Sequence, residues 1–422
     1  MCKHLYAKTI LNELNSNTYT KVTNLSEEEI VNKHSDFHRN FDIELPISMQ
    51  KLPPLHWTPK IHKTPTGSRF IIGSKMSSLK PIGKIITKIF KVVFKMKRGY
   101  YRKAGFFSGL KQFWPIDNHN EILETLSRLN SKNCATSIST FDFSTLYTKI
   151  PHDKLIDVLS NSVSSIFNDT NRKTIAIGNK RAYFVKSGTK NHKLQLNDII
   201  KCVDFLVNNA YFRVGKSIYR QIIGIPMGSD PAPFFANLFL SHYEAKWIKD
   251  TSRNNYPRSK RLFNVFRYID DLVSLNDKGE FERSHPEIYP PELVLNKENI
   301  DAKKASYLDL DIAIQQNKFE YQIYDKRNSY NFKIVRFPFY DSNLPAKMFY
   351  SSISAEILRI CRASSKSQSF FASCSPFIER MLDQGANVTK MSNSISNTIG
   401  KHFTDFNKYN MEKRLLIQNL FN

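Results

Sequence analysis

Cysteine is scarce in this sequence, and its spacing excludes the common zinc-binding patterns. The five cysteines among 422 residues are scattered between Cys2 and Cys374, and no two of them form a Cys-x-x-Cys pair. Zinc sites built on thiolates need closely spaced cysteine pairs, so we expect none here. An odd number of widely separated thiols fits a reducing compartment, and we therefore expect an intracellular protein.

Long apolar runs and a secretory leader are also missing. No apolar run reaches the ~20 residues that a membrane-spanning helix needs. The N-terminal stretch MCKHLYAKTILNEL lacks the apolar core and cleavage site of a signal peptide. The chain is nevertheless 41% hydrophobic and 13% aromatic, which is enough to form the cores of about two or three domains.

Acidic residues are the minority charge. The chain has 62 Lys and Arg residues against 38 Asp and Glu residues, which gives a formal net charge of +24. So large an excess repels itself in a folded protein, and a polyanionic partner would compensate it. Nucleic acid is the first candidate for this partner, and an anionic membrane surface is the second.

One segment contains no acid at all. Residues 79–103, LKPIGKIITKIFKVVFKMKRGYYRK, carry a basic side chain every three or four residues, and apolar residues fill most other positions. A solvated helical face normally mixes both signs, because Glu pairs with Lys four residues later. We therefore predict an amphipathic helix. Its basic face would contact the phosphates of a nucleic acid through Lys80, Lys84, Lys88, Lys91, Lys95, Arg98 and Arg102.

The rest of the chain alternates short strands and helices. The patterns predict two helices within residues 1–45, a hairpin in 211–221, a single strand over 306–315 and helices from about residue 346 onward. Residues 165–195 have the pattern of an insertion with a small hairpin that turns at Gly178-Asn179. The tripeptide Ser229-Asp230-Pro231 predicts the N-cap and first turn of a helix.

Two parts of the sequence place carboxylates on short strands. Asp142 ends the predicted strand in STFDFSTLYT, and Asp270 and Asp271 lie at the apex of a predicted hairpin, FRYIDDLVSL. If these strands are neighbours in one sheet, the three acids converge. Such a cluster fits phosphoryl transfer, because Mg²⁺ takes hard oxygen ligands and neutralises developing charge. Taken alone, each acid is better explained by ordinary turn or strand-end chemistry.

The order of these motifs resembles that of reverse transcriptases. RYIDDL resembles their Y-x-D-D box, FDFSTLYT their first palm motif, and GIPMGSDPAPFFANLFL the helix-opening motif between them. LHWTPKIHKTPTGSRFI is similar to the P-K-x-H-K … R-x-I segment in the fingers of Penelope-like retroelement polymerases, a branch related to telomerase. YLDLDI is similar to their post-palm segment, so that the resemblance spans about residues 50–365.

Two positions depart from the usual motif. Met227 stands where many reverse transcriptases carry glutamine, and Asp230 replaces a more usual small residue or proline. Neither position is an expected metal ligand. The sequence shows no GIY-YIG endonuclease, RNase H or zinc-knuckle pattern.

The resemblance implies an α+β fold, namely a right-hand polymerase with fingers, an antiparallel-sheet palm and a helical thumb. We expect a helical N-terminal extension in residues 1–45 and fingers in residues 46–135. The palm would follow in residues 136–325, with the insertion at about 165–195, and the helical thumb and C-terminal tail in residues 326–422.

The resemblance also implies roles for individual residues. Asp142 and Asp270 would be the main catalytic metal ligands, with Asp271 as the supporting acid. Tyr147 would lie under the incoming sugar and exclude a 2′-hydroxyl, although a core tyrosine is the plainer interpretation. The expected nucleotide-binding residues are Arg69, Lys60, Lys63, Tyr147, Gly228 and Ser229.

The implied function is that of an RNA-directed DNA polymerase of a retrotransposable element. It would extend a primer 3′ end by two-metal phosphoryl transfer with Mg²⁺, or with Mn²⁺ as an alternative ion. Its partners would be an RNA template, a DNA primer and dNTPs but no membrane, with a separate endonuclease as a further candidate, and it would act in the nucleus. Two alternatives stay open: a catalytically silent or domesticated descendant that only binds nucleic acid, and a right-hand polymerase that makes RNA.

Overall fold

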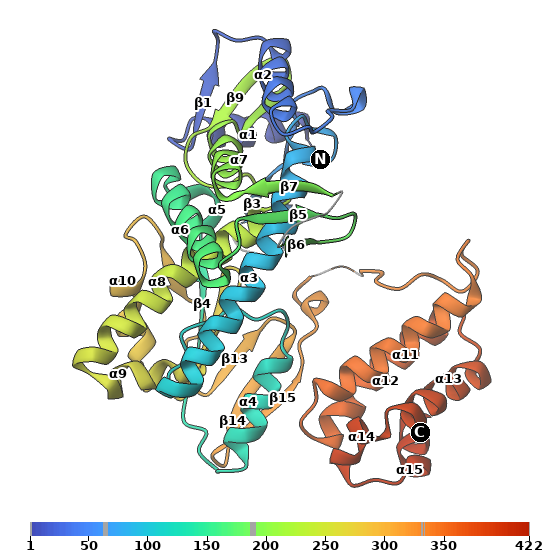
Figure 1. Cartoon of the computed structure of the whole chain (residues 1–422). Helices are drawn as coiled ribbons and strands as arrows, with labels where there is room; N and C mark the ends of the chain where they lie inside the picture. Colours follow the sequence, from blue (N-terminus) through green and yellow to red (C-terminus); the bar gives the residue numbers. More distant parts are fainter. Residues whose placement is uncertain (1, 62–65, 186–190, 331, 333, 422) are drawn as a thin grey trace. The chain divides into compact units, whose positions relative to one another are not determined.

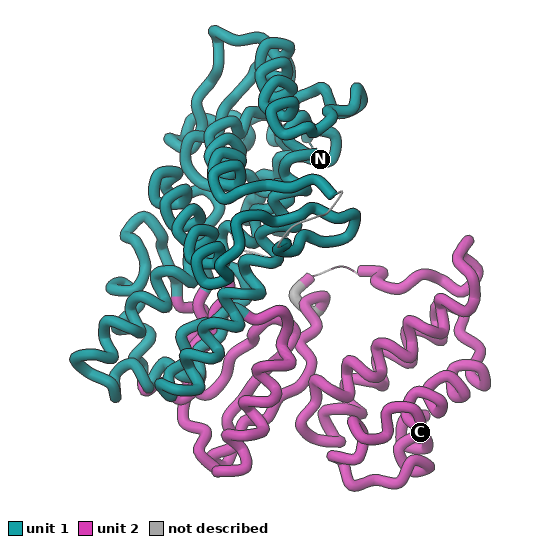
Figure 2. The backbone as a smooth tube through the Cα atoms, viewed as in Figure 1, with its two compact units in different colours: residues 1–115, 142–270, 279–296 teal, residues 116–141, 271–278, 297–422 magenta. Residues whose placement is uncertain are grey.

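The computed structural model describes residues 2–61, 66–185, 191–330, 332 and 334–421. These residues form two compact units, which Figure 2 shows in different colours. The first comprises residues 1–115, 142–270 and 279–296, and the second residues 116–141, 271–278 and 297–422. The predicted fingers, palm and thumb are continuous stretches of sequence, whereas each of these units is made of several separate stretches. The division into fingers, palm and thumb therefore stays a prediction.

The first unit combines helices with several small antiparallel sheets (Figure 1). The helices are α1 (Lys3–Leu14), α2 (Glu27–Arg39), α3 (Lys80–Ser108), α5 (Leu146–Lys149), α6 (His152–Thr170), α7 (Leu196–Asn208), α8 (Ala232–Asn254), α9 (Tyr256–Arg261) and α10 (Glu280–Ile288). Single 3₁₀ turns are η1 (Ile47–Met49), η2 (Ser74–Met76) and η3 (Leu262–Asn264).

The strands of the first unit are short. They are β1 (Tyr19–Val22), β2 (Leu55–Lys60), β3 (Gly67–Ile72), β5 (Thr174–Ile177), β6 (Ala182–Val185), β7 (His192–Gln195), β8 (Tyr211–Val214), β9 (Ser217–Gln221) and β10 (Val265–Tyr268). They form the sheets β1-β9-β8, β2-β3 and β6-β5-β7, while β10 belongs to a sheet of order β10-β11-β4-β12. That sheet also contains β4 (Ile138–Phe143), β11 (Asp271–Leu275) and β12 (Leu295–Lys297).

The second unit joins an antiparallel sheet to a helical bundle. Its strands β13 (Lys304–Tyr307), β14 (Leu310–Gln315) and β15 (Lys318–Ile323) pair in that order. Its helices and 3₁₀ turns are α4 (Asn120–Asn130), η4 (Lys326–Ser329), α11 (Ala346–Arg362), α12 (Ser367–Asp383), α13 (Val388–Lys401), α14 (Phe403–Phe406), η5 (Asn407–Tyr409) and α15 (Lys413–Phe421). Among the described residues, no helix is long and apolar enough to cross a membrane.

Helix α3 is the amphipathic helix that the sequence predicts. Its apolar face is buried and packs against α6, α7 and α8. The ring centroids of Phe90 on α3 and Phe235 on α8 are 4.9 Å apart. Each fully buried Ile or Phe contributes about 1.5–3 kcal/mol relative to an exposed one, so this face anchors the helix. The basic residues are therefore left on the remaining faces.

Three predictions of secondary structure are wrong in part. Strand β1 lies between the two N-terminal helices and pairs with β9, and the insertion contains a third strand, β7, beside its hairpin. The single strand predicted for 306–315 is two strands, β13 and β14, joined by a tight turn in which Leu308 has φ +55°. The predicted hairpin of β8 and β9 and the helices from α11 onward are present.

Candidate active site

The two acidic segments lie side by side at one end of neighbouring strands. Strands β4 and β11 are adjacent in their sheet. The amide of Phe143 donates a hydrogen bond of 3.3 Å to the carbonyl oxygen of Asp270. Asp142 is half-buried between two buried phenylalanines, because alternate residues of a strand point to opposite faces. The backbones of Asp142 and Asp270 are thus brought together, as the hypothesis of converging acids requires.

The hairpin apex differs from the prediction by one residue. The turn consists of Ile269 and Asp270, and Asp271 is already the first residue of β11. Ile269 has φ +56°, which is unfavourable for a β-branched side chain. Such strained residues cluster at functional sites, where the surrounding structure holds them in place.

A buried arginine that the sequence analysis missed holds this turn. Arg267 is completely buried, and its Nη1 donates to the Ile269 carbonyl at 2.9 Å. Its Nε donates to Glu244 of α8 at 2.5 Å, and Glu244 is also completely buried. Further hydrogen bonds join Arg267 to Asn237 and Ser241 of the same helix. The hairpin apex is therefore fixed to α8 by a satisfied ion pair.

The signal for this pair was present in the sequence. Arg267 stands between aromatic residues in a short strand, and Glu244 is a lone acid in the apolar helix of FFANLFLSHYEAKW. Charged residues at core positions are almost never buried without a partner. The Tyr289 hydroxyl adds a third member by donating to Glu244 at 2.9 Å, and burial raises the pKa of Tyr289 well above its usual value.

Gly224 lets the glycine-rich segment approach the turn that carries Tyr147. Its φ is +86°, and a Cβ at this position would overlap the carbonyl oxygen of Tyr147. The Gly224 amide donates to the Ile150 carbonyl at 2.7 Å, and the Ile225 amide donates to that of Tyr147 at 2.7 Å. A glycine is required here because only glycine combines this φ with this contact.

Gly228 makes the corresponding approach to β3, the strand that carries Arg69. Its φ is +109°, and a Cβ would overlap the carbonyl oxygen of Ile72. The Ile72 amide donates to the Met227 carbonyl at 2.8 Å, and Ser74 Oγ donates to the Gly228 carbonyl. One segment of five residues therefore fixes Tyr147 and the Arg69 strand relative to each other.

The predicted N-cap at Ser229 and Asp230 is wrong. Helix α8 starts at Ala232, its N-cap is Pro231, and no side chain caps it. Asp230 instead forms an ion pair with Lys80 at 2.8 Å, where the Lys80 side chain is 15% exposed. Lys80 begins α3, so its pairing with Asp230 joins the start of that helix to the glycine-rich segment. Ser229 lines a small pocket beside this pair.

The other predicted nucleotide-binding residues lie on the β2-β3 hairpin. Arg69 pairs across the strands with Thr58 and is exposed, and its side chain makes no hydrogen bond or ion pair with any residue that the structure describes. Lys60 lies at the end of β2 opposite Gly67. Lys63 lies outside the described residues. A guanidinium of this kind suits a phosphate, because its planar fork offers paired donors.

Tyr147 lies within electrostatic range of the hairpin acid. Burial of the ring and the charge of Asp270 together raise the pKa of Tyr147 to about 12, against a smaller opposing effect of Arg267. The phenol therefore stays neutral and protonated at physiological pH. The side chain is half-buried, so part of the ring remains accessible to a ligand.

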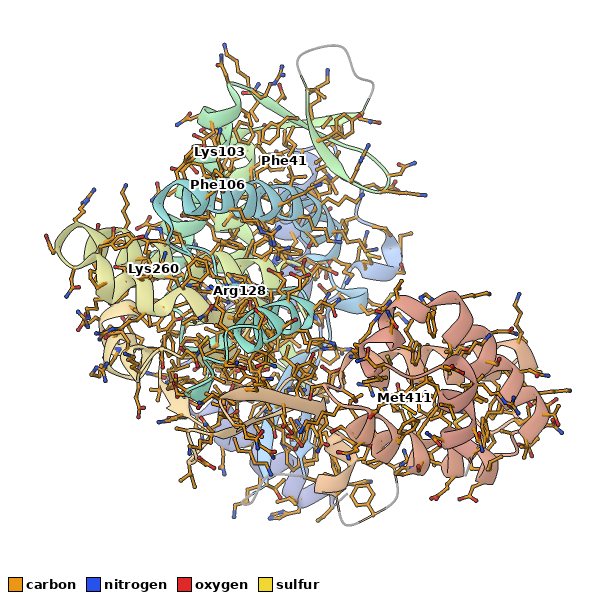
Figure 3. The ribbon with its side chains drawn as sticks, turned by 90° about the horizontal axis from the view of Figure 1, so that it is seen from below. Phe41, Lys103, Phe106, Arg128, Lys260 and Met411 are labelled. Atoms are coloured by element: carbon orange, nitrogen blue, oxygen red, sulfur yellow. The ribbon has the colours of Figure 1, made fainter. Side chains whose placement is uncertain are left out.

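The basic face of α3 is divided between exposed and engaged side chains. Lys84, Lys91, Lys95 and Arg102 are exposed. Lys80 is paired with Asp230, as described above. Lys88 donates to the Gly178 carbonyl at 3.1 Å, and the guanidinium of Arg98 lies 5.2 Å from the centroid of the Phe94 ring. The exposed Lys84, Lys91 and Lys95 are available to a polyanion, whereas the engaged Lys80 and Lys88 stabilise the fold. Lys103 and Phe106 near the end of α3 are also exposed (Figure 3).

No ready-made metal cage is present among the described residues. No group of three or more His, Cys, Asp or Glu side chains in the described ranges is arranged to hold an ion. The half-buried carboxylates of Asp142 and Asp270 nevertheless fit Mg²⁺, which polymerase-type sites bind through one or two carboxylates plus substrate phosphates and water. The donor chemistry therefore fits a metal that the substrate helps to hold.

Two solved structures of fungal telomerases are similar to this chain. Telomerase from Candida albicans, in complex with a TWJ fragment of telomeric RNA, matches with a TM-score of 0.64 at 11% identity over 99% of this chain and 67% of that chain. Telomerase from Candida tropicalis with such a fragment matches with a TM-score of 0.51 at 14% identity, again over 99% and 67%. No model of a known protein family matches the chain, and no curated protein does.

These likenesses establish the fold alone, because the identities are low. The chain has an α+β, right-hand polymerase fold with antiparallel sheets, as predicted from its motifs. The order of acidic strand end, glycine-rich segment and acidic hairpin is thus embedded in a polymerase fold.

Gly228→Ala should destabilise the protein. The alanine must adopt φ +109° and its Cβ must displace the Ile72 carbonyl, so we expect a loss of about 1–3 kcal/mol in the free energy of unfolding. Urea unfolding measures it. Gly99→Ala on α3 is the matched control, because nothing lies within 4 Å of its Cβ, and it should gain about 0.5–1 kcal/mol. Equal effects of the two variants would contradict the argument.

Glu244→Leu should be far more costly than an ordinary charge deletion. It leaves Arg267 buried without a carboxylate, which costs about 3–5 kcal/mol in the free energy of unfolding. Adding Arg267→Met to this variant should restore much of that loss, so a double-mutant cycle should give a large coupling energy. The surface pair Asp36 and Arg39 is the control, with an expected coupling of about 0.2–1 kcal/mol. A similar, small coupling at Arg267 would contradict the inferred role.

Proposed function

We propose that this protein is an RNA-directed DNA polymerase of a retroelement, of the Penelope-like type. The observation that carries the proposal is the meeting of three motifs in the first unit. The glycine-rich segment contacts Tyr147 at Gly224 and β3 at Gly228, while Asp142 and Asp270 lie at adjacent strand ends. A polymerase needs these parts together, because phosphoryl transfer depends on positioning and charge stabilisation rather than on a protein nucleophile.

Each group has a task that its surroundings support. Asp142 and Asp270, with Asp271 as supporting acid, would hold Mg²⁺, which supplies charge neutralisation to the reacting phosphates when bound. Arg69 would bind the triphosphate through its open guanidinium, helped by Lys60. The strained turn fixed by Arg267 keeps the hairpin acid in one place, since a loosely held ligand loses much of its effect.

Nucleic acid is the proposed polyanionic partner. The two Candida telomerases were solved with fragments of telomeric RNA, which supports an RNA template for this chain. The exposed basic side chains of α3 would bind the phosphate backbone of template or primer without regard to sequence. Binding should therefore weaken steeply as the salt concentration rises. The dNTPs and the primer would meet at the strand ends that carry Asp142 and Asp270.

The second candidate is a descendant that binds nucleic acid without catalysis. The lack of a three-ligand cage among the described side chains is the observation that favours it. The two candidates differ in one measurement, which is Mg²⁺-dependent extension of a primed RNA template by the purified chain. Binding without extension on any homopolymer template would favour the silent descendant.

Asp270→Asn should abolish primer extension while template binding stays nearly intact. The change removes one charged ligand oxygen without altering size, and the loss of metal-dependent charge stabilisation should lower kcat by about 10³-fold or more. Gel-based extension measures kcat, and fluorescence anisotropy measures RNA binding. Asp36→Asn, on the exposed face of α2, is the control and should extend normally. Extension by Asp270→Asn at the wild-type rate would refute the proposed function.

Tyr147→Ala should make the enzyme accept ribonucleotides more readily. The half-buried ring would lie against the sugar, and its removal opens space for a 2′-hydroxyl. Competition between ribo- and deoxynucleotides measures the change as a ratio of kcat/KM values. Tyr147→Phe keeps the ring and loses only the neutral hydroxyl, so it should discriminate like the wild type. If both variants discriminate equally, Tyr147 is a core residue and not a sugar gate.

A further inference from the structure

The second unit contains a pocket that the proposed polymerase chemistry does not use. It has a volume of about 460 Å³ and lies among β14, β15, α11 and α12. Its wall combines apolar side chains, such as Ile323 and Phe377, with the guanidinium groups of Arg327, Arg359 and Arg380. This volume is in the range of small-molecule sites, which are about 300–1,000 Å³.

Two of these arginines are neutralised by carboxylates. Arg327 binds Asp325 through Nε at 2.8 Å and through Nη2 at 2.5 Å. Arg359 binds Glu356 through Nη2 at 2.6 Å and Asp309 through Nη1 at 2.9 Å. Asp325, Glu356 and Asp309 are thus engaged by arginines, whereas Asp311, which also lines the pocket, accepts from the hydroxyl of Ser306.

Arg380 is the exception. Its side chain makes no hydrogen bond and no ion pair with any residue in the described part of the chain, although its Nη1 is buried. The Nη1 of Arg327 is also buried without a hydrogen-bond partner among these residues. A buried donor without a partner costs about 1–3 kcal/mol, and more when it is charged, so two guanidinium nitrogens in this state call for an acceptor.

The charges around Arg380 point to an anion. Burial and the neighbouring charge of Arg327 together lower the pKa of Arg380, and Asp325 and Glu356 offset this only in part. A bound anion would relieve this repulsion and accept from the guanidinium group of Arg380, which lines the pocket. A phosphate suits the place better than a carboxylate, because its oxygens point in several directions and can accept from separate guanidinium groups at once.

We propose that this pocket binds a phosphate group through the guanidinium group of Arg380, beside that of Arg327. The adjoining apolar wall of Ile323 and Phe377 suits the organic part of a phosphate ester. The phosphate belongs either to a free phosphorylated small molecule or to a nucleic-acid backbone, and both present the same chemistry. The site lies within the second unit and does not depend on polymerase activity.

The test measures ligand binding by the full chain and its Arg380→Gln variant. Inorganic phosphate, pyrophosphate and AMP are titrated against the whole protein at constant ionic strength, with chloride as reference, and thermal unfolding and calorimetry give Kd. The wild type should show a saturable rise in melting temperature, and Arg380→Gln should weaken binding by about tenfold or more. Arg128→Gln, on the exposed surface of α4 (Figure 3), is the matched control and should bind as the wild type does.

A second arm separates the two sources of the phosphate. Binding of a fluorescein-labelled single-stranded oligonucleotide is measured for the same three proteins. If Arg380→Gln weakens only the small-molecule titrations, the ligand is a free phosphate ester. If it weakens oligonucleotide binding by about tenfold while Arg128→Gln does not, the ligand is a backbone phosphate.

The proposal is overturned if neither class of ligand distinguishes Arg380→Gln from Arg128→Gln. If Arg380→Gln fails to fold, the same titrations of the wild type and of Arg327→Gln test the proposal instead. A wild type without a saturable phosphate response and without an effect of phosphate on oligonucleotide binding would exclude the site. A failure of primer extension would leave these results unaffected, because no readout involves catalysis.

Discussion

The geometry of the candidate site depends on the buried guanidinium of Arg267. All three of its nitrogens donate hydrogen bonds, to Glu244, Asn237, Ser241 and the carbonyl of Ile269. A buried arginine with these partners cannot shift without exposing an unpaired charge, so the turn and α8 move as one body. The positive φ of Ile269 is held by the same bonds. The position of the hairpin acid is therefore a consequence of core packing and not of the turn's own preference.

Backbone contact provides the second constraint. The main chain at Gly224 packs against that of Tyr147, and the main chain at Gly228 packs against that of Ile72. Both glycines lie just before α8, the helix to which Arg267 is also hydrogen-bonded. The glycine-rich segment, the hairpin and β3 are consequently positioned from one helix. Rigid support of this kind is what catalysis by positioning requires, since a displacement of about 1 Å is enough to reduce rates strongly. The same rigidity would serve a protein that only binds nucleic acid.

The sequence predicts those parts of the fold that arise from local pattern. Helix α3 follows from its apolar period, the β8-β9 hairpin from its turn residues, and the acidic hairpin from its alternation. Parts that depend on distant partners were missed or misplaced: β1 needs β9, and Asp230 pairs with Lys80 instead of capping α8. Arg267 belongs to this second group, because its role follows from Glu244 and no local rule assigns it. Order and type of motifs are readable from sequence, whereas the contacts that hold them are not.

The net charge indicates a binding partner only after the basic side chains with partners inside the protein are separated from those that are exposed. Among the basic side chains of α3, Lys80 and Lys88 form an ion pair and a hydrogen bond within the protein, whereas Lys84, Lys91 and Lys95 are exposed. A net charge of +24 cannot distinguish these two groups, since it counts a lysine in an ion pair like one in water. Exposed and unpaired cations are the ones that release counterions from a nucleic acid, so they set both affinity and its salt dependence. The case for a polyanionic partner therefore rests on this smaller set of side chains and not on composition.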